Sequence, residues 1–90
     1  MLKIIRDRDT GKTKELLKAC AEDKGFFVCR HPERVELKCH NYGIPLVKTL
    51  DYLTYARNHD EFKNMNVYID DLDEFMATVY NIKGFALNID

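Results

Sequence analysis

The sequence predicts a three-layer α/β domain with a mainly parallel sheet of five strands. Short apolar runs alternate with segments in which apolar residues recur at helical spacing, and the alternation continues along the 90 residues without a linker or low-complexity stretch. This pattern is typical of parallel strands joined by helices that cover the sheet faces. Right-handed crossovers bring the carboxyl ends of the strands to one edge, where ligands of such sheets bind. We therefore expect a single domain spanning residues 1–90.

The five expected strands are short apolar runs bounded by polar residues, glycine or proline. They lie near residues 2–6, 26–30, 45–48, 66–70 and 83–88. The third contains Pro45, which lacks a backbone donor and therefore favours an irregular strand or a sheet edge. The last contains Gly84, which indicates a bend or a close approach of two backbones.

Four helices are expected between these strands. The first begins at Thr13 and ends before Gly25, a residue type that suits a helix C-terminus. Pro32 suits the first turn of the second helix. Thr49 is the expected N-cap of the third helix, and the polar segment 57–65 that follows is an expected loop. The fourth helix follows the fourth strand.

Composition limits the classes of function. Hydrophobic residues make up 46% of the chain, which is ample for a packed core, and the net charge of −1 argues against nucleic acid as the main partner. The charge is uneven: residues 1–34 carry nine basic and six acidic side chains, whereas residues 35–90 carry five and nine. This asymmetry suits an anion site at one end and a metal or cationic partner elsewhere, or simply two differently charged solvated faces.

The cysteines and the short N-terminal apolar stretch favour a cytoplasmic protein with free thiols. The count of three is odd, and the spacing of Cys29 with His31 and of Cys39 with His40 is poor for zinc or for a cysteine nucleophile. No apolar run approaches the roughly 20 residues that span a bilayer. We expect no membrane association and a location in the cytoplasm of the host cell.

A phosphate-binding loop is the main chemical feature. An apolar run leads into a polar loop that ends Gly11-Lys12-Thr13, and an amphipathic helix follows directly. In that layout Lys12 reaches the β- and γ-phosphates and the Thr13 hydroxyl binds Mg²⁺. The full pattern G-x-x-x-x-G-K-[ST] is broken, however, because Arg6 stands in the first glycine position and Asp9 brings negative charge into the loop. The alternative is a helix N-terminus that matches four residues by chance.

The second feature is the run Val67-Tyr68-Ile69-Asp70-Asp71. An apolar strand that ends in two carboxylates is how P-loop enzymes present a Mg²⁺-holding Asp and a neighbour that aligns water. Asp70 is the expected metal residue and Asp71 the expected catalytic base. The alternative is structural, since acidic residues also favour the positive end of a helix dipole.

These segments together resemble small P-loop proteins encoded by bacteriophages and prophages. The likeness covers nearly the whole chain and includes IIRDRDTGKTKELL, IPLVKTLDYL, VYIDDLDEF and KGFALNID. It implies a stripped core of the RecA/helicase-like ATPases, with the last strand between the first strand and the 66–70 strand, and ATP or GTP with Mg²⁺ as the ligand. The loop of that family commonly reads R-x-R-G-T-G-K-T. The matching positions expected to bind the cofactor are Arg8, Thr10, Gly11, Lys12 and Thr13.

Three functions are open: an ATPase or GTPase, a nucleotide-binding module with little activity, and an accessory or inhibitor protein that acts by protein contact. We favour the third, because the departures from the P-loop pattern, Arg6 and Asp9, lie where phosphate binds, while the apolar pattern of the core is intact. Phage inhibitors of host nucleases often present carboxylates, so the expected partner surface contains Asp73 and Glu74, with Tyr55 and Phe62 as exposed aromatics. Homodimerisation through an open sheet edge or a helix face is also expected.

Overall fold

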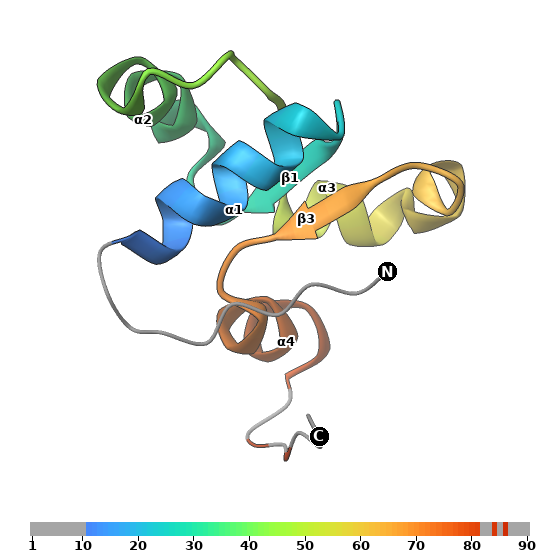
Figure 1. The fold of residues 1–90 in the computed structure, drawn as a ribbon. Helices are drawn as coiled ribbons and strands as arrows, with labels where there is room; N and C mark the ends of the chain where they lie inside the picture. Colours follow the sequence, from blue (N-terminus) through green and yellow to red (C-terminus); the bar gives the residue numbers. More distant parts are fainter. Residues whose placement is uncertain (1–10, 82–83, 85, 87–90) are drawn as a thin grey trace.

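The computed structural model describes residues 11–81, 84 and 86 of the chain (Figure 1). These residues form a three-stranded parallel sheet and four α-helices in alternating order, so the predicted α/β class is confirmed. The expected strand at 2–6 lies outside the described residues, and so does most of the expected strand at 83–88. Within the described part of the chain, no helix has the length and apolar character needed to cross a bilayer.

The sheet has the order β2-β1-β3, with both neighbours parallel to β1. Its strands are β1 (Phe26–Cys29), β2 (Lys48–Asp51) and β3 (Val67–Ile69). In the register, Phe26 lies opposite Lys48 on one side and Val67 on the other. All three strands therefore end at the same edge, which is where the sequence places its acidic pair.

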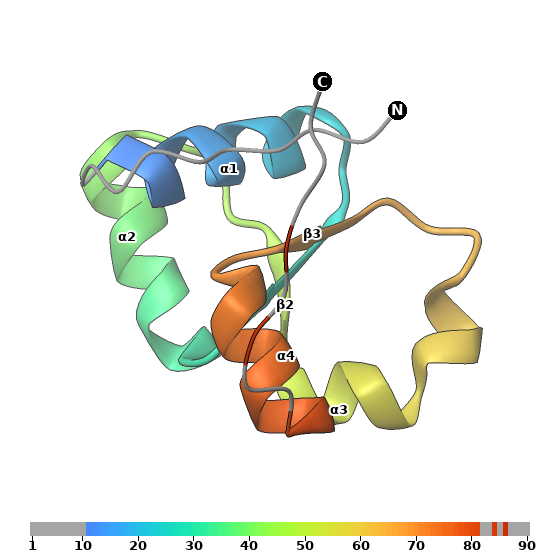
Figure 2. The ribbon, with the colours of Figure 1, turned by 90° about the horizontal axis from the view of Figure 1, so that it is seen from below.

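Two pairs of helices cover the two faces of the sheet (Figures 1 and 2). The helices are α1 (Gly11–Glu22), α2 (Val35–Tyr42), α3 (Tyr52–Arg57) and α4 (Leu72–Tyr80), with 3₁₀ turns η1 (Pro32–Arg34) and η2 (His59–Phe62). The core under α1 and α2 contains Phe27 and Cys29, whereas the core under α3 and α4 contains Val28. Because successive strand side chains point to opposite faces, β1 is buried on both sides, and this explains its uninterrupted apolar sequence.

Helix α1 ends where the sequence predicts, but Gly25 serves a different purpose from the expected one. The left-handed residue is Lys24, with φ 54°, and the Gly25 N–H donates to the Cys20 carbonyl at 2.9 Å. A Cβ added to Gly25 would lie 2.6 Å from the Asn66 carbonyl oxygen. Glycine is therefore required by the close approach of the chain that leads into β3.

The third strand lies three residues further along the chain than predicted. Residue Thr49 is inside β2, so its prediction as an N-cap is wrong; the cap of α3 is Asp51, whose Oδ1 accepts the Thr54 N–H at 2.7 Å. A carboxylate suits the positive end of a helix, and β-branched Thr49 suits a strand, so both assignments follow ordinary preferences. The expected loop 57–65 contains the 3₁₀ turn η2.

Candidate functional site

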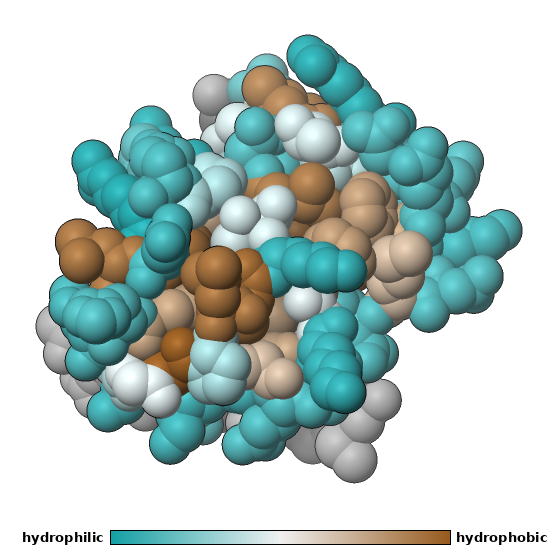
Figure 3. Space-filling model, turned by 90° about the horizontal axis from the view of Figure 1, so that it is seen from above, coloured by the Kyte–Doolittle hydropathy of each residue, from teal (hydrophilic) through white to brown (hydrophobic). Residues whose placement is uncertain are grey.

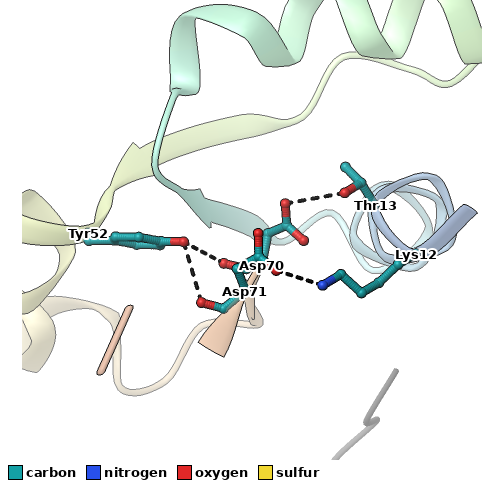
Figure 4. Close-up of polar contacts among 5 residues, drawn as sticks. All are labelled: Lys12, Thr13, Tyr52, Asp70 and Asp71. Atoms are coloured by element: carbon teal, nitrogen blue, oxygen red, sulfur yellow. Dashed lines mark hydrogen bonds and ion pairs between the residues drawn. The ribbon is translucent and has the colours of Figure 1, made fainter. Parts of the chain in front are cut away.

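The first turn of α1 lies beside the acidic turn that joins β3 to α4 (Figure 4). Lys12 and Thr13 come from α1, whereas Asp70 and Asp71 follow the last residue of β3. A parallel sheet explains the meeting, because a helix that packs on the sheet can begin at the same edge where a neighbouring strand ends. The two features that the sequence predicts separately thus come together in one place.

Asp70 is the buried member of the acidic pair. Its side chain is only 9% exposed, and its Oδ2 accepts the Thr13 hydroxyl at 3.4 Å, which is long for such a bond. Its Oδ1 has no hydrogen-bond partner among the described residues. Burial, and then the charge of Asp71, raises the pKa of Asp70, while the charges of Lys12 and Lys38 oppose the rise.

Asp71 is the exposed member of the pair and engages Lys12. The Lys12 ammonium lies 2.6 Å from Asp71 Oδ1, and the side chains are 28% and 49% exposed, respectively. The hydrogen bond to Asp71 is the largest cause that raises the pKa of Lys12. Water reaches both groups, so the pair stabilises the fold by no more than about 1 kcal/mol.

The backbone of the acidic turn is unusual and is held by Tyr52. Asp71 has φ 57° and ψ 69°, a left-handed conformation that costs a non-glycine residue free energy. The hydroxyl of Tyr52, whose side chain is 4% exposed, donates to the Asp70 carbonyl at 2.7 Å and lies 3.4 Å from that of Asp71. The Phe75 N–H donates to the Asp71 carbonyl at 3.0 Å. Tyr52 therefore holds the segment that presents both carboxylates.

Sequence reasoning missed Tyr52 as a site residue. The shifted third strand is the reason, because a strand at 45–48 places Tyr52 in the middle of a helix face. In the structure Tyr52 is the first residue of α3, directly after the end of β2, and therefore at the ligand-binding edge of the sheet. Correct placement of the Asp51 cap would have supplied the signal.

The predicted partner residues lie on α3, η2 and α4. Asp73 is exposed in the first turn of α4, and the Glu74 carboxylate forms an ion pair with Arg30 at 2.5 Å. Tyr55 and Phe62, expected to be exposed, are half-buried. Their rings pack together with centroids 6.0 Å apart, and the Phe62 ring also meets Phe26 at 5.1 Å. Much of the apolar surface of these two side chains is thus buried in contacts within the protein.

The cysteines are free, buried thiols, and the described residues contain no group of three or more His, Cys, Asp or Glu arranged to hold a metal ion. Burial raises the pKa of the Cys29 thiol to about 11 and that of Cys20 to about 12. At neutral pH these thiols stay protonated and are poor nucleophiles. The prediction of free thiols is confirmed for the three cysteines.

Comparison of the chain with protein-family models, curated proteins and solved structures gave no match. A function can therefore be proposed only from the contacts among α1, β3 and α4. Of the predicted cofactor and catalytic residues, Lys12, Thr13, Asp70 and Asp71 lie together, and Gly11 is the first residue of α1. The remaining two, Arg8 and Thr10, lie outside the described residues.

Proposed function

We propose that this chain is a P-loop-like protein that binds the phosphates of a Mg²⁺ nucleotide, ATP or GTP, weakly and without efficient hydrolysis. The observation that carries the proposal is the meeting of the Thr13 hydroxyl with Asp70, a buried carboxylate that keeps one oxygen without a partner among the described residues. Burying such a group costs free energy, and a bound cation would compensate for the cost. Thr13 and Asp70 are the two residues expected to hold Mg²⁺.

An anion at this place is favoured by α1 itself. The helix has 12 residues, and its first N–H groups have no partner within the helix. They lie at the positive end of the helix dipole, which attracts phosphate. Lys12 adds a full positive charge in the same turn. Its bond to Asp71 is weak enough for a phosphate group to replace it.

The donor set also fits Mg²⁺. This ion takes oxygen ligands in an octahedron and is usually bound by one or two carboxylates together with substrate phosphates and waters. Asp70 and Thr13 supply a carboxylate and a hydroxyl, and the described residues offer no complete set of protein ligands that would hold a metal without phosphate. Bound Mg²⁺ would neutralise phosphate charge and orient the phosphates.

Affinity should be low because of the loop that precedes α1. Asp9 places a carboxylate where the loop should surround phosphate, and one such repulsion costs on the order of a few kcal/mol. Hydrolysis should be slower still. The predicted base, Asp71, has one oxygen occupied by Lys12, and it would have to release that bond to accept a proton from water.

Calorimetry with ATP and GTP, with and without Mg²⁺, tests the proposal. We expect a dissociation constant of roughly 0.1–1 mM that depends on Mg²⁺. Binding should be lost in Lys12→Ala and in Asp70→Ala, with folding checked by circular dichroism. Lys18→Ala is the matched control, because Lys18 is an exposed lysine of the same helix. Binding that survives Lys12→Ala, or that is equally weakened by Lys18→Ala, would contradict the proposal.

A second candidate is an accessory or inhibitor protein that acts by protein contact, as the resemblance to phage proteins implies. The observation that favours it is the exposure of large apolar side chains, with Leu37 64% and Leu46 67% exposed. Figure 3 shows hydrophobic side chains gathered between hydrophilic ones on one face. Contiguous apolar surface of this kind marks partner sites when it is extensive.

The two candidates respond oppositely to mutation. If protein contact is the function, partner binding or phage fitness should survive Lys12→Ala and fail when Asp73 and Glu74 are both changed to Lys, because reversed charges at an interface cost several kcal/mol. The matched control is the reversal of Asp60 and Glu61, two exposed acidic residues of η2. Loss in Lys12→Ala with a folded protein would exclude this candidate. Sedimentation of the free chain tests whether the partner is a second copy.

A further inference from the structure

A cavity of about 150 Å³ lies at the carboxyl ends of β1 and β3. Its lining includes the two residues that follow β1, Arg30 and His31, together with Asp70 and Asp71. The volume is well above the ~10–15 Å³ that one water requires, and below the roughly 300 Å³ at which pockets for drug-sized ligands begin. The cavity therefore suits one small chemical group and is too small for a whole nucleotide.

Three cationic side chains line this cavity, namely Arg30, Arg34 and Lys38. Arg30 is engaged by Glu74. The side chains of Arg34 and Lys38 make no hydrogen bond or ion pair with another described residue. Arg34 ends η1 and Lys38 lies four residues later on α2, which is the spacing that places two side chains on the same side of a helix. Two cations without an ion-pair partner in the described part of the chain thus line one small cavity.

The charge balance of the cavity favours an anion. Asp71 is offset by Lys12 and Arg30 by Glu74, so the charged lining groups without an ion pair to another described residue are Arg34, Lys38 and Asp70. Two positive charges against one negative charge leave an excess of +1. Lys38 and Asp70 line the same cavity, and the charge of Lys38 opposes the rise in the pKa of Asp70.

The walls of the cavity strengthen this preference. Phe27 and Val35 are 1% and 2% exposed and form part of the lining. These apolar side chains lower the local dielectric constant on one side of the cavity, so a charge–charge contact beside them is stronger than the same contact in water. Hydrogen bonds from a guanidinium or ammonium group to an oxyanion are roughly twice as strong as those between neutral groups.

We propose that this cavity binds one small oxyanion, a phosphate or carboxylate group, between Arg34 and Lys38. Its cations differ from Lys12 at the N-terminus of α1, which would hold nucleotide phosphates, but the two sites adjoin, because Asp70 and Asp71 also line this cavity. Oxyanion binding here requires no nucleotide at the first site. The oxyanion belongs to a free ion or to a small molecule that carries it beyond the mouth of the cavity.

Titration of the full chain with orthophosphate in Mg²⁺-free buffer tests the site. We expect saturable binding that weakens about tenfold or more when Arg34 and Lys38 are both changed to Gln. The matched control changes Lys18 and Lys63, two exposed lysines, to Gln and removes the same net charge. Arg34→Gln alone, a change at an exposed residue, serves as the second variant if the double variant does not fold.

The double variant Lys12→Ala, Asp71→Asn separates the two sites, because it removes the Lys12 ammonium without leaving an unpaired Asp71 carboxylate at the cavity. Orthophosphate affinity that stays within about twofold in this variant and falls in the Arg34 and Lys38 variant supports the inference. Affinity that falls in the Lys12 and Asp71 variant instead, or equally in the Lys18 and Lys63 control, overturns it, as does the absence of saturable binding. Failure of Mg²⁺ nucleotide binding with orthophosphate binding intact would refute only the proposed function.

Competition identifies the form of the oxyanion. Displacement of bound orthophosphate by acetate supports a site open to carboxylates. Displacement by methyl phosphate but not by acetate supports a phosphate group carried on a small molecule. If neither acetate nor methyl phosphate displaces orthophosphate, the cavity binds the free phosphate ion and excludes phosphate groups carried on a larger molecule.

Discussion

Replacing Tyr52 with Phe removes one oxygen and leaves the ring in place. The lost hydroxyl is 2.7 Å from the Asp70 carbonyl, in a side chain that is 4% exposed. Water cannot readily replace the donor, so the buried carbonyl loses its partner at a cost of about 1–3 kcal/mol. For a domain of this size each kcal/mol lowers Tm by about 4–8 °C. We therefore expect Tm to fall by at least about 4 °C.

Thermal unfolding, urea unfolding and Mg²⁺ nucleotide binding are the three measurements for Tyr52→Phe. Tyr55→Phe is the matched control, because Tyr55 lies on the same helix and its hydroxyl makes no hydrogen bond with a described residue. The control should change the free energy of unfolding by less than about 0.5 kcal/mol. In Tyr52→Phe, nucleotide affinity should also fall below that of the control under conditions where both are fully folded, because the Asp70-Asp71 turn can relax.

Equal stability of the two variants would refute this reasoning. It would mean that backbone contacts alone hold the acidic turn. Two such contacts exist: the Asp70 N–H donates to the Val28 carbonyl at 2.9 Å, and the Phe75 N–H donates to the Asp71 carbonyl at 3.0 Å. A stability loss without any loss of affinity would show that Tyr52 supports the fold but does not position the carboxylates.

Three other predictions concern the rest of the chain. Gly25→Ala should destabilise the fold by about 1–3 kcal/mol in urea unfolding, since the added Cβ would lie 2.6 Å from the Asn66 carbonyl oxygen; a neutral effect would refute the close approach. Burial raises the pKa of Cys20 to about 12 and of Cys29 to about 11, so both should resist alkylation in the native protein at neutral pH. The pKa values of both thiols are higher in the folded state than the ordinary thiol value of 9.0, so the stability that the protonated thiols contribute is complete below pH 9.0 and is lost as pH rises through 11 to 12. Urea unfolding of Cys20→Ala over the same pH range separates the contribution of Cys20 from that of Cys29. Asp9→Gly should strengthen ATP binding by about tenfold in calorimetry, and no change would point to a collapsed loop in place of charge repulsion.

Local sequence patterns were sufficient to predict the α/β class and to single out the two segments that meet at the candidate site. The apolar run of β1 indicates a strand buried on two faces, and parallel pairing on both sides agrees. Parallel topology then requires the strand ends to share an edge, so the pair Asp70 and Asp71 could be placed at that edge. Lys12 and Thr13 reach it because α1 packs on the adjacent face of the sheet.

The details that sequence reasoning missed depend on tertiary contacts. The segment from Ile44 to Asp51 satisfies strand preferences at several registers, and pairing with β1 selects the later one. The later register places Tyr52 directly after β2, at the edge of the sheet where the strands end. The sequence pattern does not distinguish Arg34 and Lys38 from ordinary solvent-exposed charges. The packing of α2 beside the end of β1 brings them to the cavity. Neither effect leaves a local signal.

The contact between Lys12 and Asp71 does not by itself show that the phosphate site is inactive. Both side chains are partly exposed, so breaking their ion pair costs at most about 1 kcal/mol, which is about a fivefold loss of affinity. A carboxylate facing phosphate, as the sequence predicts for Asp9, would cost on the order of a few kcal/mol, and this is the larger expected obstacle. The buried Asp70 acts in the opposite direction, because a cation with phosphate would supply the partner that its Oδ1 lacks. The proposal of weak, Mg²⁺-dependent binding rests on the balance of these three effects.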